Sequence, residues 1–283
     1  MQKKLRRLRM GLMTVLGLRK LGFFIPYRYA AQIPPLEQRT SYGALETLFH
    51  GRERVFCDVL EDIQALAPDL QAIGNEQPPE PRWRQDWFPR LDAMAAYTMV
   101  RRIKPKRIVE VGSGHSTRFW ARAARDGNLD ISITAIDPAP RADISKLNVS
   151  VVRETVQGAG LAPFSELVRG DILSIDSSHI LMPGSDVDFL FNGVLPTLAP
   201  GVNVHIHDMF LPDGYPPSWE WRGYNEQLAV ATLLQGRGYD VLWSSHYVLT
   251  RMRDEVDKTD VIGRTECPKG AFETSLWLRK SLP

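Results

Sequence analysis

The sequence is poor in cysteine and in net charge. Its two cysteines among 283 residues, Cys57 and Cys267, lie far apart and form no CxxC pair. This scarcity argues against a disulfide scaffold or a thiolate zinc site and fits a reducing compartment, so we expect a cytoplasmic protein. Lys and Arg number 35 against 33 Asp and Glu, a net charge of +2. Because nucleic-acid binding needs a strongly basic face, we expect no nucleic-acid partner.

Acidic residues are missing from the N-terminal segment, where the first is Glu37. The apolar run over residues 10–18 is far shorter than the ~20 residues of a membrane-spanning helix. Such a run also occurs in signal peptides, but Arg19 and Lys20 follow it at once and no A-x-A site closes it. We interpret residues 1–30 as a basic amphipathic segment that contacts a partner or an anionic surface, such as the inner membrane face. The alternative is an N-terminal helix packed on the body of the protein, with its basic side chains solvated. The basic residues are Lys3, Lys4, Arg6, Arg7, Arg9, Arg19, Lys20 and Arg28.

Hydrophobic periodicity divides the chain into two parts. Residues 44–67 place apolar side chains at spacings of three and four, which predicts a helix. From residue 107 onward, short β-branched runs alternate with helical patterns, one of them over residues 187–198. This alternation predicts a Rossmann-like α/β fold, a mostly parallel sheet with helices on both faces. We therefore expect a basic N-terminal segment and helical cap over residues 1–82 and an α/β domain over residues 83–283.

A glycine-rich loop follows the first predicted strand of this sheet. Residues 110–117, EVGSGHST, place Gly112 and Gly114 on either side of Ser113. Glycine adopts backbone angles closed to other residues and lets a ligand approach the main chain. The next predicted strand ends at Asp137, 23 positions after Gly114, where an acid is placed to bind ribose hydroxyls. Loop, helix and distant acid together favour an adenosine cofactor over an ordinary tight turn.

The chemistry of this loop favours S-adenosylmethionine over a dinucleotide. The dinucleotide fingerprint has a third glycine at the place that Thr117 occupies here. Glu110, just before the loop, would repel a pyrophosphate and attract a cationic amino group. S-adenosylmethionine carries an amino group and a sulfonium and no phosphate. We therefore expect S-adenosylmethionine as the cofactor and keep a nicotinamide dinucleotide as the alternative.

Several segments carry a resemblance to a known family. RIVEVGSGHST, residues 107–117, resembles motif I of class I S-adenosylmethionine-dependent methyltransferases. Residues 170–179, 184–202 and 205–216 resemble a bacterial branch of that superfamily, methyltransferase family 24, and the similarity covers about residues 85–280. The resemblance implies a seven-stranded sheet of order 3-2-1-4-5-7-6 with an antiparallel seventh strand.

The resemblance also implies the contacts of the cofactor. The glycine loop would lie near the methionine part, Asp137 would hold the ribose, and Gln157, after the third strand, would contact the adenine. The implied cofactor-binding residues are Glu110, Gly112, Ser113, Gly114, Asp137 and Gln157.

Two predicted strands end in polar residues, Asp176 to His179 after one and His207-Asp208 after the other. The carboxyl ends of strands form the ligand crevice of an open α/β sheet, so we expect Asp176, His207 and Asp208 to converge beside the methyl donor, with Asp176 in contact with the cofactor. His207 or His179, with Asp208 nearby, is a candidate catalytic base for the acceptor hydroxyl.

Alternatively, Asp176, His207 and Asp208 bind a divalent metal. The resemblance implies metal ligands at these strand ends, and imidazole suits Mn²⁺, Fe²⁺ or Zn²⁺ better than Mg²⁺. A purely structural interpretation makes His205 a satisfied buried histidine and Asp208 a turn residue.

Together these features predict an S-adenosylmethionine-dependent methyltransferase that acts on a small-molecule acceptor. An oxygen acceptor is the first choice, because a base and a candidate metal site lie at the strand ends. The alternatives are a nicotinamide-dependent oxidoreductase and a methyltransferase-like protein that binds without turnover. The oligomeric state stays open. Aromatic residues near the crevice in sequence are expected either to form a lid or to pack accessory helices: Trp83, Trp87, Trp219, Trp221 and Tyr224.

Overall fold

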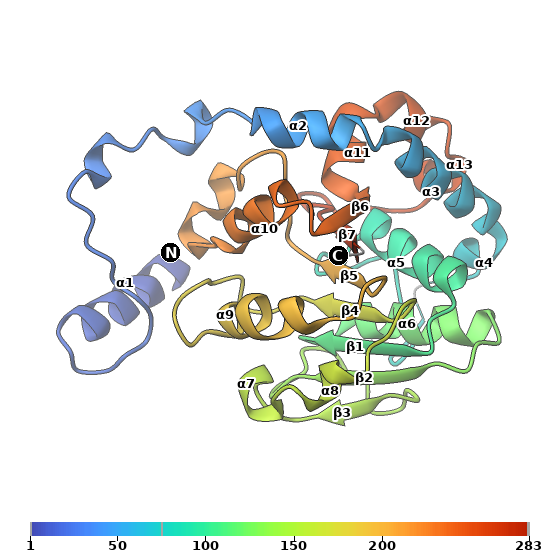
Figure 1. Ribbon diagram of the computed structural model, residues 1–283, viewed down its shortest axis with the longest axis horizontal. Helices are drawn as coiled ribbons and strands as arrows, with labels where there is room; N and C mark the ends of the chain where they lie inside the picture. Colours follow the sequence, from blue (N-terminus) through green and yellow to red (C-terminus); the bar gives the residue numbers. More distant parts are fainter. Residues whose placement is uncertain (1, 75, 282–283) are drawn as a thin grey trace. The chain divides into compact units, whose positions relative to one another are not determined.

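The computed structural model of the chain describes residues 2–74 and 76–281. They form two compact units, residues 1–39 and residues 40–283 (Figure 1). The larger unit holds the sheet and every candidate site residue. It also includes residues 40–82, for which the sequence predicts part of an N-terminal cap.

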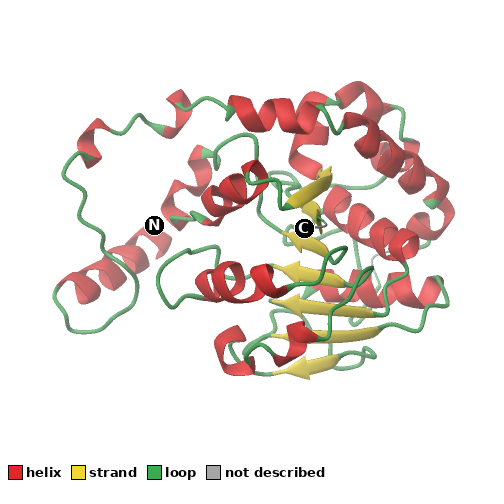
Figure 2. Cartoon of the chain, viewed as in Figure 1, coloured by secondary structure: helices red, strands yellow, loops and turns green. Residues whose placement is uncertain are grey.

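Seven strands form one sheet in the larger unit, in the order β3-β2-β1-β4-β5-β7-β6 (Figure 2). The strands from β3 to β5 run parallel, whereas β7 is antiparallel to both β5 and β6. This order and the antiparallel last strand confirm the expected Rossmann-like fold. The strands are β1 (Arg107–Val111), β2 (Ser132–Ile136), β3 (Ser150–Val152), β4 (Ile172–Ile175), β5 (Asn203–Ile206), β6 (Tyr239–Ser244) and β7 (Leu276–Lys280).

The central strands are buried along their whole length. Every residue of β4 and β5 is buried, as expected for parallel strands covered on both faces. The register places the polar residues Ser174 of β4 and His205 of β5 side by side. Their side chains bond to each other, with Ser174 Oγ 2.9 Å from His205 Nδ1. Ser275 Oγ lies 2.9 Å from Nε2 of the same ring, so this buried histidine has both nitrogens satisfied.

Two helices pack together beside the glycine loop. α5 (Arg90–Ile103) ends where Lys104 adopts a left-handed conformation just before Pro105. α6 (His115–Asp126) begins directly after the loop and packs against α5. Further helices of this unit include α2 (Gly43–His50), α3 (Glu53–Ala65), α4 (Ala67–Gln71), α7 (Val156–Ala159), α8 (Ala162–Ser165), α10 (Glu226–Gln235), α11 (Ser245–Arg251), α12 (Arg253–Asp257), α13 (Asp260–Arg264) and the 3₁₀ helix η5 (Pro217–Arg222).

Two helices expected from the sequence are interrupted. The pattern over residues 44–67 forms α2 and α3, because the first helix ends at Gly51. The single helix expected over residues 187–198 is wrong. The chain there forms α9 (Asp186–Asp188), a π-helical stretch η3 (Phe189–Val194) and a 3₁₀ turn η4 (Leu195–Thr197). Pro196 has no N–H to donate, so a regular α-helical ladder cannot continue through it.

An aromatic cluster joins α2 and α3 to the last part of the fold. Phe49 of α2 and Phe56 of α3 lie 5.5 and 5.8 Å from the ring of Tyr247, centroid to centroid. Phe56 also meets Trp243 of β6 edge to face, at 6.2 Å. All four rings are buried, and each such pair adds about 1 kcal/mol beyond its buried area. Residues 40–82 therefore share one core with the sheet.

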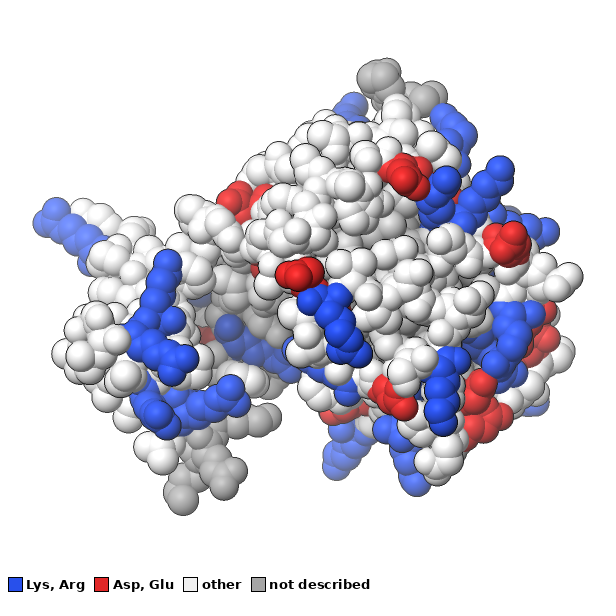
Figure 3. Space-filling model, turned by 90° about the horizontal axis from the view of Figure 1, so that it is seen from below, with Lys and Arg blue, Asp and Glu red and all other residues white. Residues whose placement is uncertain are grey.

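The smaller unit consists of α1 (Gln2–Val15) and two short 3₁₀ helices, η1 (Ala30–Gln32) and η2 (Leu36–Gln38). No side chain between residues 5 and 39 is buried. Figure 3 shows Lys and Arg on one face of the molecule, and the described basic side chains of this unit are exposed, among them Arg6, Arg7, Arg9, Arg19, Lys20 and Arg28. Within the described residues, no helix combines the length and the apolar composition that crossing a membrane requires.

Candidate active site

The glycine loop and the end of β4 are in direct contact. Gly112 adopts a φ of 79°, and a Cβ placed on it would lie 1.9 Å from the carbonyl oxygen of Asp176. The backbone N–H of Asp176 in turn donates to the carbonyl of Val111 at 2.9 Å. Only glycine fits this position. The predicted cofactor loop and the predicted strand-end cluster are thus adjacent.

Asp137 fixes the conformation of the same loop. Its Oδ2 accepts from the backbone N–H of Ser113 at 2.7 Å and from the Ser113 hydroxyl at 3.1 Å. Its Oδ1 accepts from the N–H of Ala139 at 2.8 Å. Gln157, the predicted adenine contact, lies exposed on α7 and donates to the carbonyl of Gly184 at 3.1 Å. The ribose and adenine roles of these two residues stay predictions.

Glu110 is fully buried between β1 and α6. Its carboxylate accepts hydrogen bonds from Ser116 at 2.5 Å, from the indole of Trp120 at 2.8 Å and from the Thr117 hydroxyl. Thr117 Oγ1 also accepts from the N–H of Gly114 at 2.9 Å, which links the carboxylate to the loop. Burial raises the pKa of Glu110 to about 7, although these hydrogen bonds oppose the shift. The role of Glu110 toward the methionine part stays a prediction.

This raised pKa predicts a pH-dependent stability that Glu110→Gln removes. The pKa of about 7 in the folded protein exceeds the usual 4.5. The stability contributed by the protonated group is therefore complete below about pH 4.5 and is lost as the pH rises through 7. We expect the wild-type free energy of unfolding to fall relative to that of Glu110→Gln by about 3 kcal/mol between pH 4 and pH 8. Urea unfolding of both proteins across this range measures the difference, and parallel curves would contradict it.

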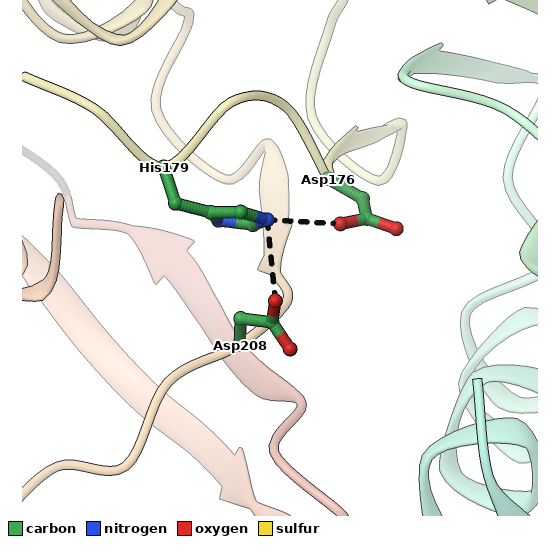
Figure 4. A group of neighbouring side chains, drawn as sticks. All are labelled: Asp176, His179 and Asp208. Atoms are coloured by element: carbon green, nitrogen blue, oxygen red, sulfur yellow. Dashed lines mark ion pairs between the residues drawn. The ribbon is translucent and has the colours of Figure 1, made fainter. Parts of the chain in front are cut away.

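His179 lies between two aspartates, Asp176 at the end of β4 and Asp208 after β5 (Figure 4). Its Nε2 is 3.3 Å from an oxygen of each. Its Nδ1 is 2.8 Å from Oε2 of Glu226, at the start of α10. The ring is buried, whereas the side chain of Asp176 is 34 % exposed. One nitrogen thus faces the two aspartates, and a buried carboxylate fixes the orientation of the ring.

His207 approaches the same two aspartates from the end of β5. Its Nδ1 lies 3.5 Å from Asp208 and 3.7 Å from Asp176. Its Nε2 lies 3.0 Å from Oδ2 of Asp92, on the first turn of α5. Both histidines therefore share one arrangement, with the inner nitrogen toward the aspartates and the outer nitrogen on a buried carboxylate. The structure brings together Asp176, His207 and Asp208, as expected for the ends of neighbouring parallel strands, and it adds His179 to them.

The backbone is strained at two of these residues. His179 and Asp208 both adopt positive φ angles, 61° and 59°. Such conformations cost a non-glycine residue about 1–3 kcal/mol each and persist where surrounding contacts hold them. The carbonyl of His179 accepts the N–H groups of Asn225 and Glu226 at 3.1 and 3.3 Å. The side chain of Asn225 bonds to both the N–H and the carbonyl of Leu181. The start of α10 thus holds the loop of His179 in place.

The aspartates set the protonation of both imidazoles. Burial disfavours the charged form of His179, but hydrogen bonds to Asp176 and Glu226 outweigh it and raise its pKa well above the ordinary value. Burial is likewise outweighed at His207, where hydrogen bonds to Asp176 and Asp92 raise the pKa. The two rings in turn overcome the effect of burial on Asp176 and hold its pKa well below the ordinary range. The aspartates therefore stabilise the imidazolium form of both histidines.

Asp92 and Glu226 complete the site, and the sequence reasoning missed both. Each is fully buried in the first turn of a helix. A signal was present for Asp92, because it shares a helix face with Ala95, Ala96 and Met99, all of them buried. An acid on an apolar face must be paired inside the fold. Besides its bond to His207, Asp92 accepts from two backbone N–H groups, at 2.8 Å each.

His205 and His115 lie outside the cluster. His205, bonded on both sides by serines, matches the structural interpretation, and burial lowers its pKa to about 3. His115 begins α6, where burial lowers its pKa to about 4.

The cluster lines a cavity of about 130 Å³. Asp176, His179, His207 and Asp208 all contribute to its wall. A larger cavity of about 340 Å³ lies beside α6 and β2, but no histidine lines it. We therefore place the site in the smaller cavity.

Aromatic side chains form much of the remaining wall of the small cavity. Trp87, Trp219, Tyr224 and Phe272 line it, together with Arg141 and Arg222. The guanidinium of Arg222 lies 3.9 Å from the ring centroid of Trp219, and that of Arg141 lies 4.8 Å from Trp87. Trp83 instead packs in the core against Phe119, at 5.3 Å.

The donors in the cluster fit a divalent cation. One donor atom each from Asp176, His179 and Asp208 lies within 4.8 Å of the others. Glu226 on the far nitrogen of His179 supplies the outer carboxylate that metal-bound histidines commonly have. This set contains His179 where the sequence prediction has His207, whose Nδ1 faces the same two aspartates. A mixed imidazole and carboxylate set suits Mn²⁺, Fe²⁺ or Zn²⁺.

Residues 109–209 match a family described as a methyltransferase domain, family 24. No curated protein sequence matches the chain. Among solved structures, the chain is similar to the Podospora anserina methyltransferase PaMTH1 bound to S-adenosylhomocysteine (SAH), with 15% identity and a TM-score of 0.44. This match covers 92% of this chain and all of that one. An O-methyltransferase from Bacillus cereus in complex with SAH is 14% identical, with a TM-score of 0.42, over 79% of this chain and 91% of that one. A third structure, described as cmcI-D160 with Mg and S-adenosylmethionine, is 18% identical, with a TM-score of 0.40, over 76% and 84% of the two chains.

Proposed function

Because residues 109–209 carry the methyltransferase domain of family 24, we propose that the protein transfers a methyl group from S-adenosylmethionine to a hydroxyl oxygen of a small molecule. One observation carries the proposal. The glycine loop touches the backbone of Asp176, which places the histidine and aspartate cluster beside the expected cofactor loop. Methyl transfer needs the acceptor oxygen in line with the sulfonium carbon, so this adjacency is what the reaction requires.

The glycine loop suits this cofactor in three ways. Asp137, already bonded to the loop, keeps one lone pair on Oδ1 for a ribose hydroxyl. Gly112 lets the loop lie against the backbone of Asp176, so that a methionine part bound at the loop would lie beside the cluster. Glu110 and Asp176 place negative charge near an amino group and a sulfonium, which favours this ligand over a pyrophosphate. Ser113 and Gly114 complete the loop, and Gln157 is the proposed contact of the adenine.

The reaction has a simple proton balance. The acceptor oxygen forms a bond to the methyl carbon, the bond from carbon to sulfur breaks, and the sulfonium becomes the thioether of S-adenosylhomocysteine. The hydroxyl proton must leave, and Nε2 of an unprotonated His179 is placed to take it, with Asp176 and Asp208 stabilising the imidazolium that forms. Glu226 holds the ring in orientation through Nδ1. His207, held by Asp92, supports the same aspartates.

A divalent cation is part of the proposal. Asp176, His179 and Asp208 would hold it, with His207 as a further donor. Such a cation acidifies a bound hydroxyl and orients it. With the cation bound, Nε2 of His179 would be a ligand and no longer the base, and the acidified acceptor hydroxyl would need only a weaker base.

The acceptor is proposed to be small and at least partly flat. The cavity of about 130 Å³ has walls of Trp87, Trp219 and Tyr224. A flat acceptor ring can stack on such aromatic walls, and walls that close over the acceptor would exclude water. The acceptor class and a cytoplasmic location remain part of the proposal, as does the absence of a nucleic-acid partner.

Calorimetric titration of the metal-stripped protein tests this function. We expect binding of SAH and no binding of NAD, because Glu110 and Asp176 disfavour a pyrophosphate. We then expect Mn²⁺ to bind the wild type and to bind at least tenfold more weakly to Asp208→Asn, which removes one charged donor. Asp240→Asn, a half-exposed acid on β6, is the matched control.

Each contrary result selects another function. Binding of NAD alone would point to a nicotinamide-dependent oxidoreductase. Binding of neither ligand by the folded protein would point to a methyltransferase-like protein without turnover. Equal Mn²⁺ binding by wild type and Asp208→Asn would leave His179 as the base and remove the metal from the proposal.

A further inference from the structure

Helix α1 presents an apolar stripe to solvent. Leu5, Leu8, Leu12 and Val15 recur at spacings of four and three along α1, which places them on one face. They are 68, 58, 53 and 59 % exposed. A contiguous exposed stripe of this kind commonly marks an interaction surface.

The chain that follows α1 extends the same apolar surface. Leu16, Leu18, Phe24 and Ile25 are each more than 60 % exposed. Hydrogen bonds inside the segment fix the turn that follows α1. The N–H of Leu18 donates to the carbonyl of Met13 at 3.0 Å. The N–H of Leu21 also donates to Thr14 Oγ1, at 3.0 Å. Internal bonds therefore shape this segment while its apolar side chains remain uncovered.

The charge of the segment indicates what covers it. Eight Lys and Arg residues precede the first acid, Glu37, while the rest of the chain holds 27 basic and 33 acidic residues. Arg6, Arg7 and Arg9 are exposed and interleave with the leucines of the stripe. An anionic surface would attract this segment and repel the remainder of the protein, whose net charge is negative.

We propose that residues 2–29 dock the protein on a bilayer surface that carries anionic lipid headgroups. α1 has 14 residues, too few for the ~20 needed to span the bilayer. The helix therefore lies in the plane of the interface, with its leucine stripe at the acyl boundary and its arginines among the phosphates. The two chemistries act together, because a short apolar stripe or a few basic residues alone bind weakly and reversibly.

Vesicle flotation with the full chain tests the proposal. The probes are vesicles of phosphatidylcholine mixed in equal parts with phosphatidylglycerol, and vesicles of phosphatidylcholine alone. We expect binding to the mixed vesicles, with at least tenfold weaker binding to the neutral ones and a steep loss on addition of salt.

Three sets of variants separate the contributions. The double variant Leu8→Asp and Leu12→Asp breaks the stripe and is expected to weaken binding to mixed vesicles at least tenfold. The triple variant Arg6→Glu, Arg7→Glu and Arg9→Glu is expected to abolish the preference for phosphatidylglycerol. The matched control, Leu161→Asp with Val168→Asp, changes residues that are 48 and 50 % exposed in the larger unit and is expected to bind like the wild type.

Other occupants of the stripe give different results. If the body of the protein covers it, the Leu8 and Leu12 variant lowers the melting temperature and no vesicle binding is seen. If a second copy covers it, the same variant changes the mass measured by light scattering and leaves vesicle binding absent. Equal binding to both vesicle types, or full binding by the leucine variant, also overturns the proposal.

Discussion

Replacing His179 with alanine is expected to lower kcat for methyl transfer by a factor of about 10²–10⁴. The ring is the group whose Nε2 reaches both Asp176 and Asp208, at 3.3 Å each. Its removal takes away the proposed base of the metal-free site or, when a cation is bound, one of the proposed metal ligands. The glycine loop is untouched, so the dissociation constant of SAH is expected to change less than about threefold.

The matched control for this variant is His50→Ala. His50 is exposed and pairs with Glu53 of α3, far from the cluster in the sequence, so kcat is expected to stay unchanged. Removal of the buried ring leaves Glu226 unpaired, so thermal melting of His179→Ala must accompany the kinetics. His179→Gln fills more of the space, so it provides a second measurement of kcat in a variant that loses less packing. Full activity of a folded His179→Ala, together with loss in His207→Gln, would move the base to His207.

The strand-end chemistry was visible in the sequence because parallel strands share an edge. Runs such as Ile172–Ile175 and Asn203–Ile206 end in polar residues, and the fold places these ends side by side. The glycine loop was visible because Gly112 follows a strand and precedes a helix. Both features depend on spacing along the chain, and spacing is what a sequence displays.

The partners of the histidines were hidden because they come from distant segments. Asp92 reaches His207 across 115 positions and Glu226 reaches His179 across 47. No local pattern places these carboxylates on the outer nitrogens. The positive φ of His179 was hidden as well, because the start of α10 holds the carbonyl of this residue through two tertiary hydrogen bonds.

The regular helix expected over residues 187–198 failed for a local reason that the sequence did contain. Pro196 lies inside the run, and the missing N–H is compatible with a 3₁₀ turn and not with a continued α-helix. The apolar side chains Leu190, Val194 and Leu195 are nevertheless buried. Burial of this stripe was thus predictable, whereas the regularity of the backbone was not.

Gly112→Ala is expected to be the most damaging single change in the glycine loop. The new Cβ would lie 1.9 Å from the carbonyl oxygen of Asp176, and the residue would keep a φ of 79°. Both the clash and the backbone strain must be relieved by moving the loop away from β4. We expect a loss of about 3 kcal/mol or more in the free energy of unfolding. Because the same loop is proposed to hold the cofactor, SAH binding should weaken at least tenfold.

Gly114→Ala provides the comparison within the same loop. Gly114 has an extended φ of 162°, and the nearest atom to an added Cβ is the methyl group of Ala142 at 3.8 Å, an ordinary contact. We expect this variant to stay within about 1 kcal/mol of the wild type. Urea unfolding followed by tryptophan fluorescence measures stability, and calorimetry with SAH measures binding. Equal effects of the two substitutions would mean that the loop tolerates separation from Asp176, and the contact that joins the cofactor loop to the His179 cluster would lose its proposed importance.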